Sequence, residues 1–276
     1  MKQLSVLFFS LLAFTACGKK QTGLPDVISG SDTSQPRGIR VLCYNVHHAN
    51  PPSKPNIIDI EAIALVIKQQ QPDLVALQEI DVYTERSGKT LHQANELAAR
   101  TGMKAYFAKA IDYGGGEYGI AILSKHPMEN MKSFPLPTAE GTGGEPRILA
   151  TAVINLPGNK KIIFACTHMD AQSKDTNRVI QIKKIVDILK QETLPVIIAG
   201  DFNADPSTPV IQILDGHFTR TCQTGCGFTI PVNNPSKTID FIAYSPNSAF
   251  TVKQHRVIDE KYASDHLPVF AILDLK

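Results

Sequence analysis

Several apolar segments of this chain end on polar side chains that a packed core does not need. Asp201 and Asn203 follow the apolar run 196–199 and a glycine, and His168 and Asp170 follow the run 162–166. The pattern recurs at three further places: Asn45 after 39–44, Glu79 after 74–78, and Asp265 with His266 before 267–270. Because open α/β sheets bind ligands at the carboxyl ends of their strands, we expect these side chains to meet at one site.

Three of these side chains suit a hard divalent cation. Glu79 and Asp265 supply carboxylate oxygens and Asn45 supplies an amide oxygen. Oxygen atoms are the ligands that Mg2+ prefers in proteins. No cysteine stands among these positions, which argues against a structural zinc site.

The remaining side chains suit hydrolysis at phosphorus. Asp201 and Asn203 can orient and deprotonate an attacking water. His168 and His266, together with the metal, can stabilise the negative charge that develops on the phosphate. A single aspartate at a strand end is more often a helix cap or a turn residue. The prediction of phosphate-ester cleavage therefore rests on the coincidence of many such residues in one chain.

Strands and helices alternate along the chain in an order that can position these residues. We expect strands at 39–46, 73–78, 104–109, 120–123, 147–155, 160–167, 196–199, 238–244 and 267–275, and helices at 56–71, 91–100, 175–191 and 208–214. The glycine-rich segment 113–119 and the proline- and glycine-rich segment 128–144 are expected to be loops. Because hairpins interrupt the alternation, the order favours mixed sheets covered by helices.

Length and composition set broad limits. A chain of 276 residues with 43% hydrophobic residues can bury one large core. The 28 Lys and Arg nearly balance the 26 Asp and Glu, so the strongly basic surface of a dedicated duplex-binding protein is missing. A small or locally recognised substrate is favoured.

The amino-terminal residues predict export. Lys2 precedes the apolar run 4–14, which is too short to span a bilayer but suits the hydrophobic region of a secretory signal. Residues 15–17, Thr-Ala-Cys, resemble a bacterial lipoprotein cleavage box. We therefore expect a signal peptide at 1–17, Cys17 as the lipidated residue, a flexible tether at 18–37 and a catalytic domain at 38–276. An ordinary secretory signal is the alternative.

The other four cysteines divide into two pairs. Cys43 and Cys166 lie inside apolar strand runs and are expected to be core residues. Cys222 and Cys226 lie in a loop, where an exported protein can form a disulfide. A zinc site is the alternative, but no second pair of zinc ligands is nearby in the sequence.

The polar residues at the ends of the apolar segments, taken in order, resemble the motif set of the endonuclease/exonuclease/phosphatase superfamily. The matching stretches are Asn45 after a strand, Leu77-Gln-Glu79, Thr167-His168-Met-Asp170, Gly200-Asp201-Phe-Asn203, Ile239-Asp240-Phe-Ile and Ser264-Asp265-His266-Leu-Pro-Val. The resemblance runs from about residue 40 to the carboxyl terminus. It implies a four-layered α/β sandwich, in which two mixed β-sheets lie face to face, flanked by helices, with the site at one edge.

The resemblance also implies roles for particular residues. Glu79 would be the principal Mg2+ ligand, with Asn45 and Asp265 nearby and Mn2+ as a plausible substitute. Asp240 would hydrogen-bond His266, fixing its tautomer. The roles implied for the other positions are these: Glu117 as the carboxylate partner of His168, and Arg147, Arg86 and Asp170 near the substrate phosphate. A salt link to a loop lysine is the alternative for Glu117.

Together these features predict an exported, lipid-anchored, Mg2+-dependent phosphoesterase on the periplasmic or outer side of a bacterial membrane. We expect it to be a monomer acting on phosphodiesters, as a nuclease or sphingomyelinase does, with nucleic acid as one candidate substrate. A sugar- or inositol-phosphate phosphatase of the same fold is the alternative. Two other classes are a non-catalytic surface lipoprotein and a zinc hydrolase using His47, His48 and His168. We rank the last lowest, because adjacent histidines on an extended strand point apart.

Overall fold

The computed structural model describes Met1, residues 37–246 and residues 250–276. The stretch Pro36–Lys276 forms one compact unit. Apart from Met1, the predicted signal peptide lies outside the described residues, and so does the predicted tether up to residue 36. Within the described part of the chain, no helix has the length and hydrophobicity needed to cross a bilayer.

Across the described residues, twelve strands form two six-stranded sheets. The first sheet has the order β11 (Phe250–Val257), β12 (Val269–Leu275), β1 (Ile39–Asn45), β2 (Leu74–Val82), β4 (Gly116–Ser124) and β3 (Lys104–Tyr113). The second has the order β5 (Met128–Leu136), β6 (Arg147–Leu156), β7 (Lys160–His168), β8 (Val196–Asp201), β10 (Asp240–Tyr244) and β9 (Thr219–Arg220). Each sheet has one parallel pair, β1 with β2 and β7 with β8, so both sheets are mixed.

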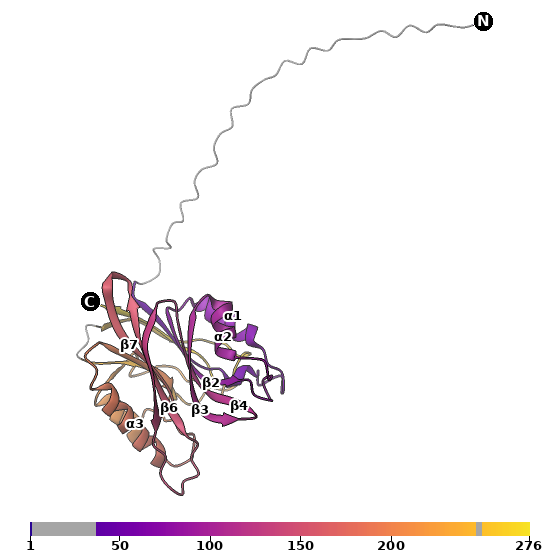
Figure 1. The fold of residues 1–276 in the computed structure, drawn as a ribbon. Coiled ribbons are helices and arrows are strands. Elements are labelled where there is room, and N and C mark those ends of the chain that lie inside the picture. The colour runs from indigo at the N-terminus through magenta and orange to yellow at the C-terminus, as the bar shows by residue number, and fades with distance from the viewer. Residues whose placement is uncertain (2–36, 247–249) are drawn as a thin grey trace, which may run out of the picture. The chain divides into compact units, whose positions relative to one another are not determined.

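The sheets lie face to face between two layers of helices. Helices α1 (Ile60–Gln70) and α2 (Gln93–Thr101) pack on the first sheet, and α3 (Thr176–Leu189) and α4 (Pro209–Asp215) pack on the second. Figure 1 shows α1 and α2 on the opposite side of the strands from α3. A third cluster of apolar residues, among them Val41 and Phe164, fills the space between the sheets. The predicted four-layered α/β sandwich is confirmed.

The register of the central strands brings the predicted polar tips to one edge of the molecule. His168 lies opposite Asp201 in the parallel pair, and Asp240 lies opposite Asp201 in the antiparallel pair next to it. In the other sheet, Asn45 lies opposite Gln78. The two sheets therefore present their functional residues to each other at the same end.

The helices and central strands were predicted well, but three strands were missed. Residues 128–136 form β5 within the segment expected to be a loop, and β9 (Thr219–Arg220) and β11 (Phe250–Val257) were not foreseen. All three are edge strands, which pair on one side only and bury few side chains, so their sequences carry little hydrophobic pattern. Pro135 is tolerated in β5 because an edge strand need not donate every backbone hydrogen bond. The first helix begins at Ile60 rather than near 56, because Asp59 caps it by accepting from Ala62 N at 3.0 Å.

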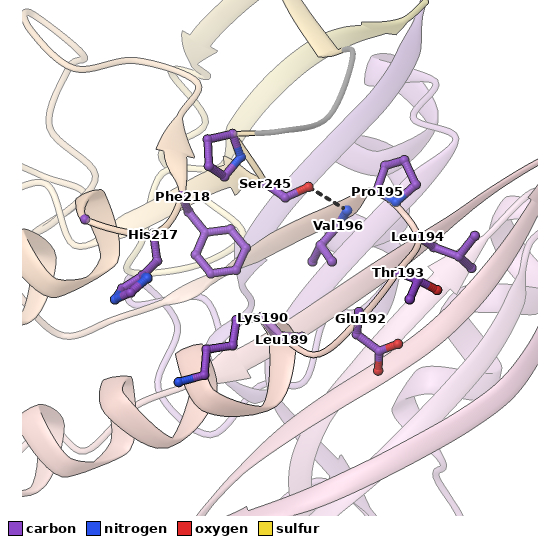
Figure 2. A pocket seen from close by; sticks show the side chains of 12 residues that line it. Leu189, Lys190, Glu192, Thr193, Leu194, Pro195, Val196, His217, Phe218 and Ser245 are labelled. Atoms are coloured by element: carbon purple, nitrogen blue, oxygen red, sulfur yellow. Dashed lines mark hydrogen bonds between the residues drawn. The ribbon is translucent and has the colours of Figure 1, made fainter.

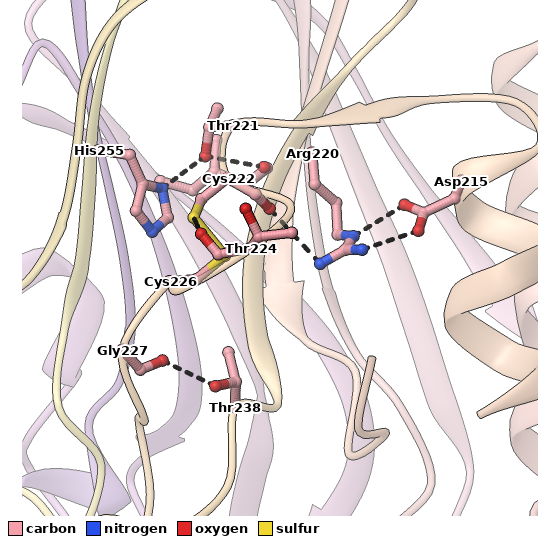
Figure 3. The surroundings of a disulfide bond; sticks show 10 residues. Asp215, Arg220, Thr221, Cys222, Thr224, Cys226, Gly227, Thr238 and His255 are labelled. Atoms are coloured by element: carbon pink, nitrogen blue, oxygen red, sulfur yellow. Dashed lines mark hydrogen bonds and ion pairs between the residues drawn. A yellow bond between two sulfur atoms is a disulfide. The ribbon is translucent and has the colours of Figure 1, made fainter. Parts of the chain in front are cut away.

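The cysteine predictions are also confirmed. Cys43 and Cys166 are free and buried, and Cys222 is bonded to Cys226. Figure 3 shows the disulfide beside β9 and β11, where Thr221 Oγ1 lies 2.8 Å from His255 Nδ1. Five residues close this ring, so we expect it to fix the local path of the loop more than the stability of the whole domain.

Candidate active site

Asp201, the last residue of β8, lies at the centre of the site. The side chain is 1% exposed. Its Oδ2 lies 3.0 Å from Asn45 Nδ2, 3.5 Å from His168 Nε2 and 3.7 Å from His266 Nε2. Four of the residues predicted from widely separated parts of the sequence therefore meet around one carboxylate oxygen. Burial and the nearby charge of Asp240 raise the pKa of Asp201 to about 7.

The backbone on both sides of Asp201 explains the Gly-Asp-Phe-Asn sequence. A Cβ atom on Gly200 would lie only 2.3 Å from the carbonyl oxygen of Thr167, so β7 and β8 require a glycine there. Asn203 adopts a positive φ of 49° and donates its backbone N–H to Asp201 Oδ1 at 2.8 Å. Its side chain donates to Met169 O at 3.0 Å. Asn203 thus fixes the orientation of the Asp201 carboxylate.

Asn45 connects the two sheets, but not in the predicted way. Its Nδ2 donates to Glu79 Oε1 and to Asp201 Oδ2, each at 3.0 Å. Its Oδ1, the atom expected to bind a metal, accepts the backbone N–H of His47 at 3.1 Å. Because that N–H can only donate, it fixes the amide orientation. In this structure the Asn45 amide nitrogen is therefore a donor that positions two carboxylates, and its oxygen accepts a backbone hydrogen bond.

The sequence suggested that Glu79 follows the end of its strand, but the structure differs. It lies inside β2 at an irregularity in the pairing with β4, and its φ of +59° turns the side chain toward the site. Burial alone raises the pKa of Glu79, but His48, His168 and the hydrogen bond from Asn45 outweigh burial and lower it. Glu79 is consequently a stable anion.

Asp240 and His266 form a buried pair, as the resemblance implied. His266 Nδ1 lies 2.9 Å from Asp240 Oδ2. Burial lowers the pKa of His266, but Asp240 more than reverses this effect and brings it to about 10. The imidazolium therefore directs its Nε2–H toward Asp201 Oδ2.

The segment before β10 holds the backbone on both sides of His266. Leu267 N donates to Thr229 O at 2.7 Å, and Val232 N donates to Asp265 O at 2.9 Å. Asp265 itself is half-buried and is joined to the site through Ser264. Ser264 Oγ lies 2.7 Å from the Asn45 carbonyl oxygen and 3.4 Å from Asp265 Oδ1.

His266 predicts a pH-dependent stability for the metal-free protein. Since its folded-state pKa of about 10 exceeds the unfolded value of 6.5, the stabilisation is complete below pH 6.5 and is lost as pH rises through 10. In the presence of a chelator we expect the Tm to fall by roughly 5 °C more between pH 7 and pH 10 in wild type than in His266→Gln. Equal slopes for the two proteins would contradict the charged pair. Surface Lys and Tyr residues titrate in the same way in both proteins, so their effect cancels in the difference between the two Tm changes.

His168 is held by an arginine, and not by the expected glutamate. Arg147 Nη1 lies 3.1 Å from His168 Nδ1, and a guanidinium in a protein can only donate. Nδ1 is therefore the acceptor, and the proton of the neutral ring is on Nε2, facing Asp201. Burial and Arg147 both lower the pKa of His168. His168 thus presents a fixed, uncharged N–H to the site.

This geometry predicts that an amide can replace the His168 ring. Asparagine also offers a neutral N–H donor, so His168→Asn should retain activity within about tenfold of wild type, whereas His168→Ala should lose about a hundredfold, the usual cost of losing a donor to a developing oxyanion. Steady-state kcat and KM of the two variants, with matched Tm values, test this. Equal losses of activity in the two variants would show that the His168 imidazole does not act simply as a neutral hydrogen-bond donor.

Three predicted residues are engaged elsewhere. Glu117 pairs with Lys109, at 3.3 Å, as the alternative for this residue anticipated. Arg86 donates through Nε and Nη2 to the fully buried Asp81 at 2.7 and 2.9 Å. Asp170 is buried and accepts from Gln172 N and Asn177 Nδ2, which shapes the loop after β7. These bonds give all three side chains local structural partners, so the roles first expected for them need revision.

Three further residues of the site had no part assigned to them in the predicted centre. His48, named only in the zinc alternative, has its Nδ1 3.8 Å from Glu79 Oε2. Ser264, quoted only within a matching stretch, lies with its Oγ 2.7 Å from the Asn45 carbonyl oxygen. Tyr118 was not singled out at all; burial together with Glu79 raises the pKa of its hydroxyl. For the zinc alternative, His47 contacts Asn50, His48 contacts Glu79 and His168 contacts Asp201. In the described part of the chain these three histidines do not form a ligand cluster; the cluster there consists of Asp201, Asp240 and His266.

The side chains fit a divalent cation. Ligand atoms of Asp201, Asp240 and His266 all lie within 4.8 Å of one another, and since His266 is protonated in its pair with Asp240, the two carboxylates are the ligands available to a cation. Asp240 Oδ1 is buried and has no hydrogen-bond partner among residues 37–246 and 250–276, and an unpaired buried carboxylate oxygen is costly unless a cation or water meets it. Glu79 provides a further stable carboxylate on the other side of Asn45.

A separate cavity of about 360 Å³ lies at the other end of β8. Figure 2 shows it between Lys190, His217 and Phe218, beside the bond from Val196 N to Ser245 Oγ. Val196 begins the strand and Asp201 ends it. The cavity is therefore distinct from the catalytic cluster.

Comparison with known proteins agrees with this geometry. The model of the Endonuclease/Exonuclease/phosphatase family matches residues 42–266. The chain belongs to this family. The enzymes for which this family is named cleave phosphate esters, and members of the family depend on a metal.

Similar proteins include members of this family from several organisms. Nocturnin from Xenopus laevis is 28% identical over 211 residues, which cover 67% of this chain and 52% of that protein, so this chain spans about half its length. The structure of an endonuclease/exonuclease/phosphatase from Beutenbergia cavernae has a TM-score of 0.74 at 25% identity, covering 87% of this chain and 72% of that one. A mannosyl-6-phosphatase from Bacteroides thetaiotaomicron has a TM-score of 0.71 at 21% identity, covering 85% and 99%, and shares the fold.

Proposed function

We propose that this family member is an exported, lipid-anchored phosphodiesterase that uses a divalent cation, Mg2+ or in its place Mn2+. The observation that carries the proposal is the arrangement around Asp201, whose Oδ2 faces one amide and two imidazole donors. One carboxylate able to accept a proton therefore lies among groups able to stabilise negative charge. Hydrolysis of a phosphate ester requires both.

Each residue has a distinct part in this reaction. Asp201, with a pKa of about 7, is suited to orient and deprotonate the attacking water near neutral pH. His168 offers a neutral Nε2–H and His266 a charged one to the phosphoryl oxygens. A divalent cation bound beside Glu79 would supply Lewis-acid stabilisation of the phosphate charge.

The charges of the arginines favour a diester over a monoester. A monoester dianion carries more negative charge than a diester monoanion and needs more cationic partners. Arg86 is neutralised by Asp81, and Arg147 lies 3.3 Å from Glu145 Oε1 while it also holds His168. The positive charge of each guanidinium is already paired with a carboxylate of the chain, which supports a singly charged substrate.

Matched synthetic esters test this proposal. We expect kcat/KM for bis(p-nitrophenyl) phosphate to exceed that for p-nitrophenyl phosphate, with both activities lost in chelator and restored by Mg2+ or Mn2+. Plasmid DNA, sphingomyelin and inositol phosphates, assayed side by side, then identify the natural class. Faster cleavage of the monoester would favour a sugar- or inositol-phosphate phosphatase, the activity class named for the structural neighbour from Bacteroides thetaiotaomicron.

The anchoring part of the proposal rests on the sequence around Cys17, which lies outside the described residues. Metabolic labelling with a fatty acid in a bacterial host should label wild type, and Cys17→Ser should remove the label and release the protein from the membrane fraction. Unlabelled wild-type protein, found soluble outside the cytoplasm, would indicate an ordinary secretory signal. Sedimentation of the domain should give the mass of a monomer.

A further inference from the structure

The turn that follows Asn45 has an unusual backbone. His47, His48 and Ala49 have φ values of 46°, 42° and 58°, in the left-handed region that residues other than glycine rarely adopt. Such backbone conformations are strained, and strain of this kind is concentrated at functional sites. The turn therefore calls for an explanation beyond connecting β1 to α1.

Hydrogen bonds to its backbone atoms hold this strained turn in place. His47 N donates to Asn45 Oδ1 at 3.1 Å, and Asp59 N donates to Ala49 O at 2.7 Å. Gln93, fully buried at the start of α2, donates its Nε2 to His48 O at 2.7 Å. Three separate elements thus determine where His48 lies.

The result of this positioning is that the His48 ring faces Glu79. His48 Nδ1 lies 3.8 Å from Glu79 Oε2, and the side chain is 14% exposed. This nitrogen is buried and has no hydrogen-bond partner in the described part of the chain. His47, the adjacent residue, differs in that its Nδ1 lies 2.8 Å from Asn50 O. Of these two adjacent histidines, His48 is the one that leaves a buried ring nitrogen unpaired, and that nitrogen lies beside a carboxylate.

The separation of these two atoms suits two ligands of one ion. A distance of 3.8 Å exceeds that of a hydrogen bond. Metal–ligand bonds of about 2.0 to 2.2 Å allow two ligands of the same ion to lie about 3 to 4 Å apart. The amide oxygen of Asn45, a ligand expected from the sequence, accepts a hydrogen bond from His47 N. His48 Nδ1 is therefore a candidate for a second protein ligand.

We propose that His48 Nδ1 joins Glu79 in binding the divalent cation, and that this nitrogen makes the site hold a first-row transition ion such as Co2+ more tightly than Mg2+. Imidazole nitrogen suits borderline ions, whereas Mg2+ strongly prefers oxygen. The proposal concerns the ion of the proposed phosphodiesterase. It is tested by ion binding without substrate, so its failure is distinguishable from the failure of the proposed activity.

The test uses His48→Asn with His47→Asn as the matched control. Asparagine tolerates a positive φ better than most residues and offers an amide oxygen in place of the ring nitrogen. Isothermal titration of the metal-free, untagged proteins should show that His48→Asn weakens Co2+ binding by at least about tenfold and changes Mg2+ binding by less than about threefold. His47→Asn should change neither affinity. Equal Co2+ affinities in the two variants would overturn the proposal.

A spectroscopic measurement makes the result independent of small losses in folding. In pulsed electron paramagnetic resonance of Mn2+-loaded protein, wild type should show coupling to an imidazole nitrogen that His48→Asn abolishes. Glu79→Gln should remove the same signal, which separates this ion from any bound by Asp201, Asp240 and His266. A nitrogen signal that survives in both variants would place the ion elsewhere and overturn the proposal.

Discussion

Replacing Asp201 with asparagine should reduce diester hydrolysis by at least about a hundredfold, the usual scale for losing an acid–base group. The amide cannot accept the proton of the attacking water, and its NH2 group would face the donors of Asn45, His168 or Asn203. We measure kcat/KM with bis(p-nitrophenyl) phosphate at saturating metal.

The same substitution should leave the Tm within a few degrees of wild type. Burial and the charge of Asp240 make the ionised form of Asp201 unfavourable, as its raised pKa shows. Loss of that charge offsets loss of the hydrogen-bond acceptor. Asp205→Asn is the control, because it makes the same chemical change on the next loop, where the carboxylate only accepts from Ser207. Full activity in Asp201→Asn would exclude Asp201 as the base.

Glu79→Gln should abolish metal-dependent activation. This half-buried carboxylate is a stable anion beside Asn45 and His48, and a neutral amide cannot supply the charge that a divalent cation requires. We expect activity to fall at least about a hundredfold and the metal concentration for half-maximal activity to rise more than about tenfold. Glu85→Gln, at an exposed carboxylate paired with Lys89, should change neither value.

Removal of the negative charge should lower the stability of the folded protein in Glu79→Gln, whereas removal of the charge of Asp201 favours the fold. The folded protein lowers the pKa of Glu79, so its ionised form stabilises the fold above the unfolded pKa of 4.5. In chelator at pH 7, Glu79→Gln should therefore melt below wild type, and the difference should shrink as the pH falls below 4.5. Metal dependence that persists unchanged in this variant would place the ion away from Glu79.

The central elements could be predicted because their sequences bury both faces. β8 (Val196–Asp201) is buried throughout, and the continuous apolar run reports this directly. Edge strands lack that signal: β5 (Met128–Leu136) is mostly exposed, and its sequence resembles a loop. The ends of the central strands were accordingly the most reliable part of the prediction, and the site residues are at those ends.

The sequence predicted the positions of the site residues better than the side chains with which each of them pairs. The resemblance implied Glu117 as the partner of His168 and placed Arg147 near the substrate phosphate. In the structure Arg147 contacts His168, and Glu117 pairs with Lys109. Likewise Asn45 was expected to offer its oxygen to a metal, whereas the backbone of His47 occupies that atom. Such choices depend on distances of a few tenths of an ångström between distant segments, and no local pattern encodes them.

The sequence by itself determined the layered α/β architecture, the family, and the identity of the residues at the strand ends, because hydrophobic runs and the polar residues that end them are local properties of the chain. Only the tertiary structure decided which atoms face one another. The convergence on Asp201, the arginine behind His168 and the strained turn that aims His48 at Glu79 each depend on contacts between segments far apart in the chain. Such contacts exist only once both sheets are packed, which is why the chemistry of single atoms had to be taken from the folded protein.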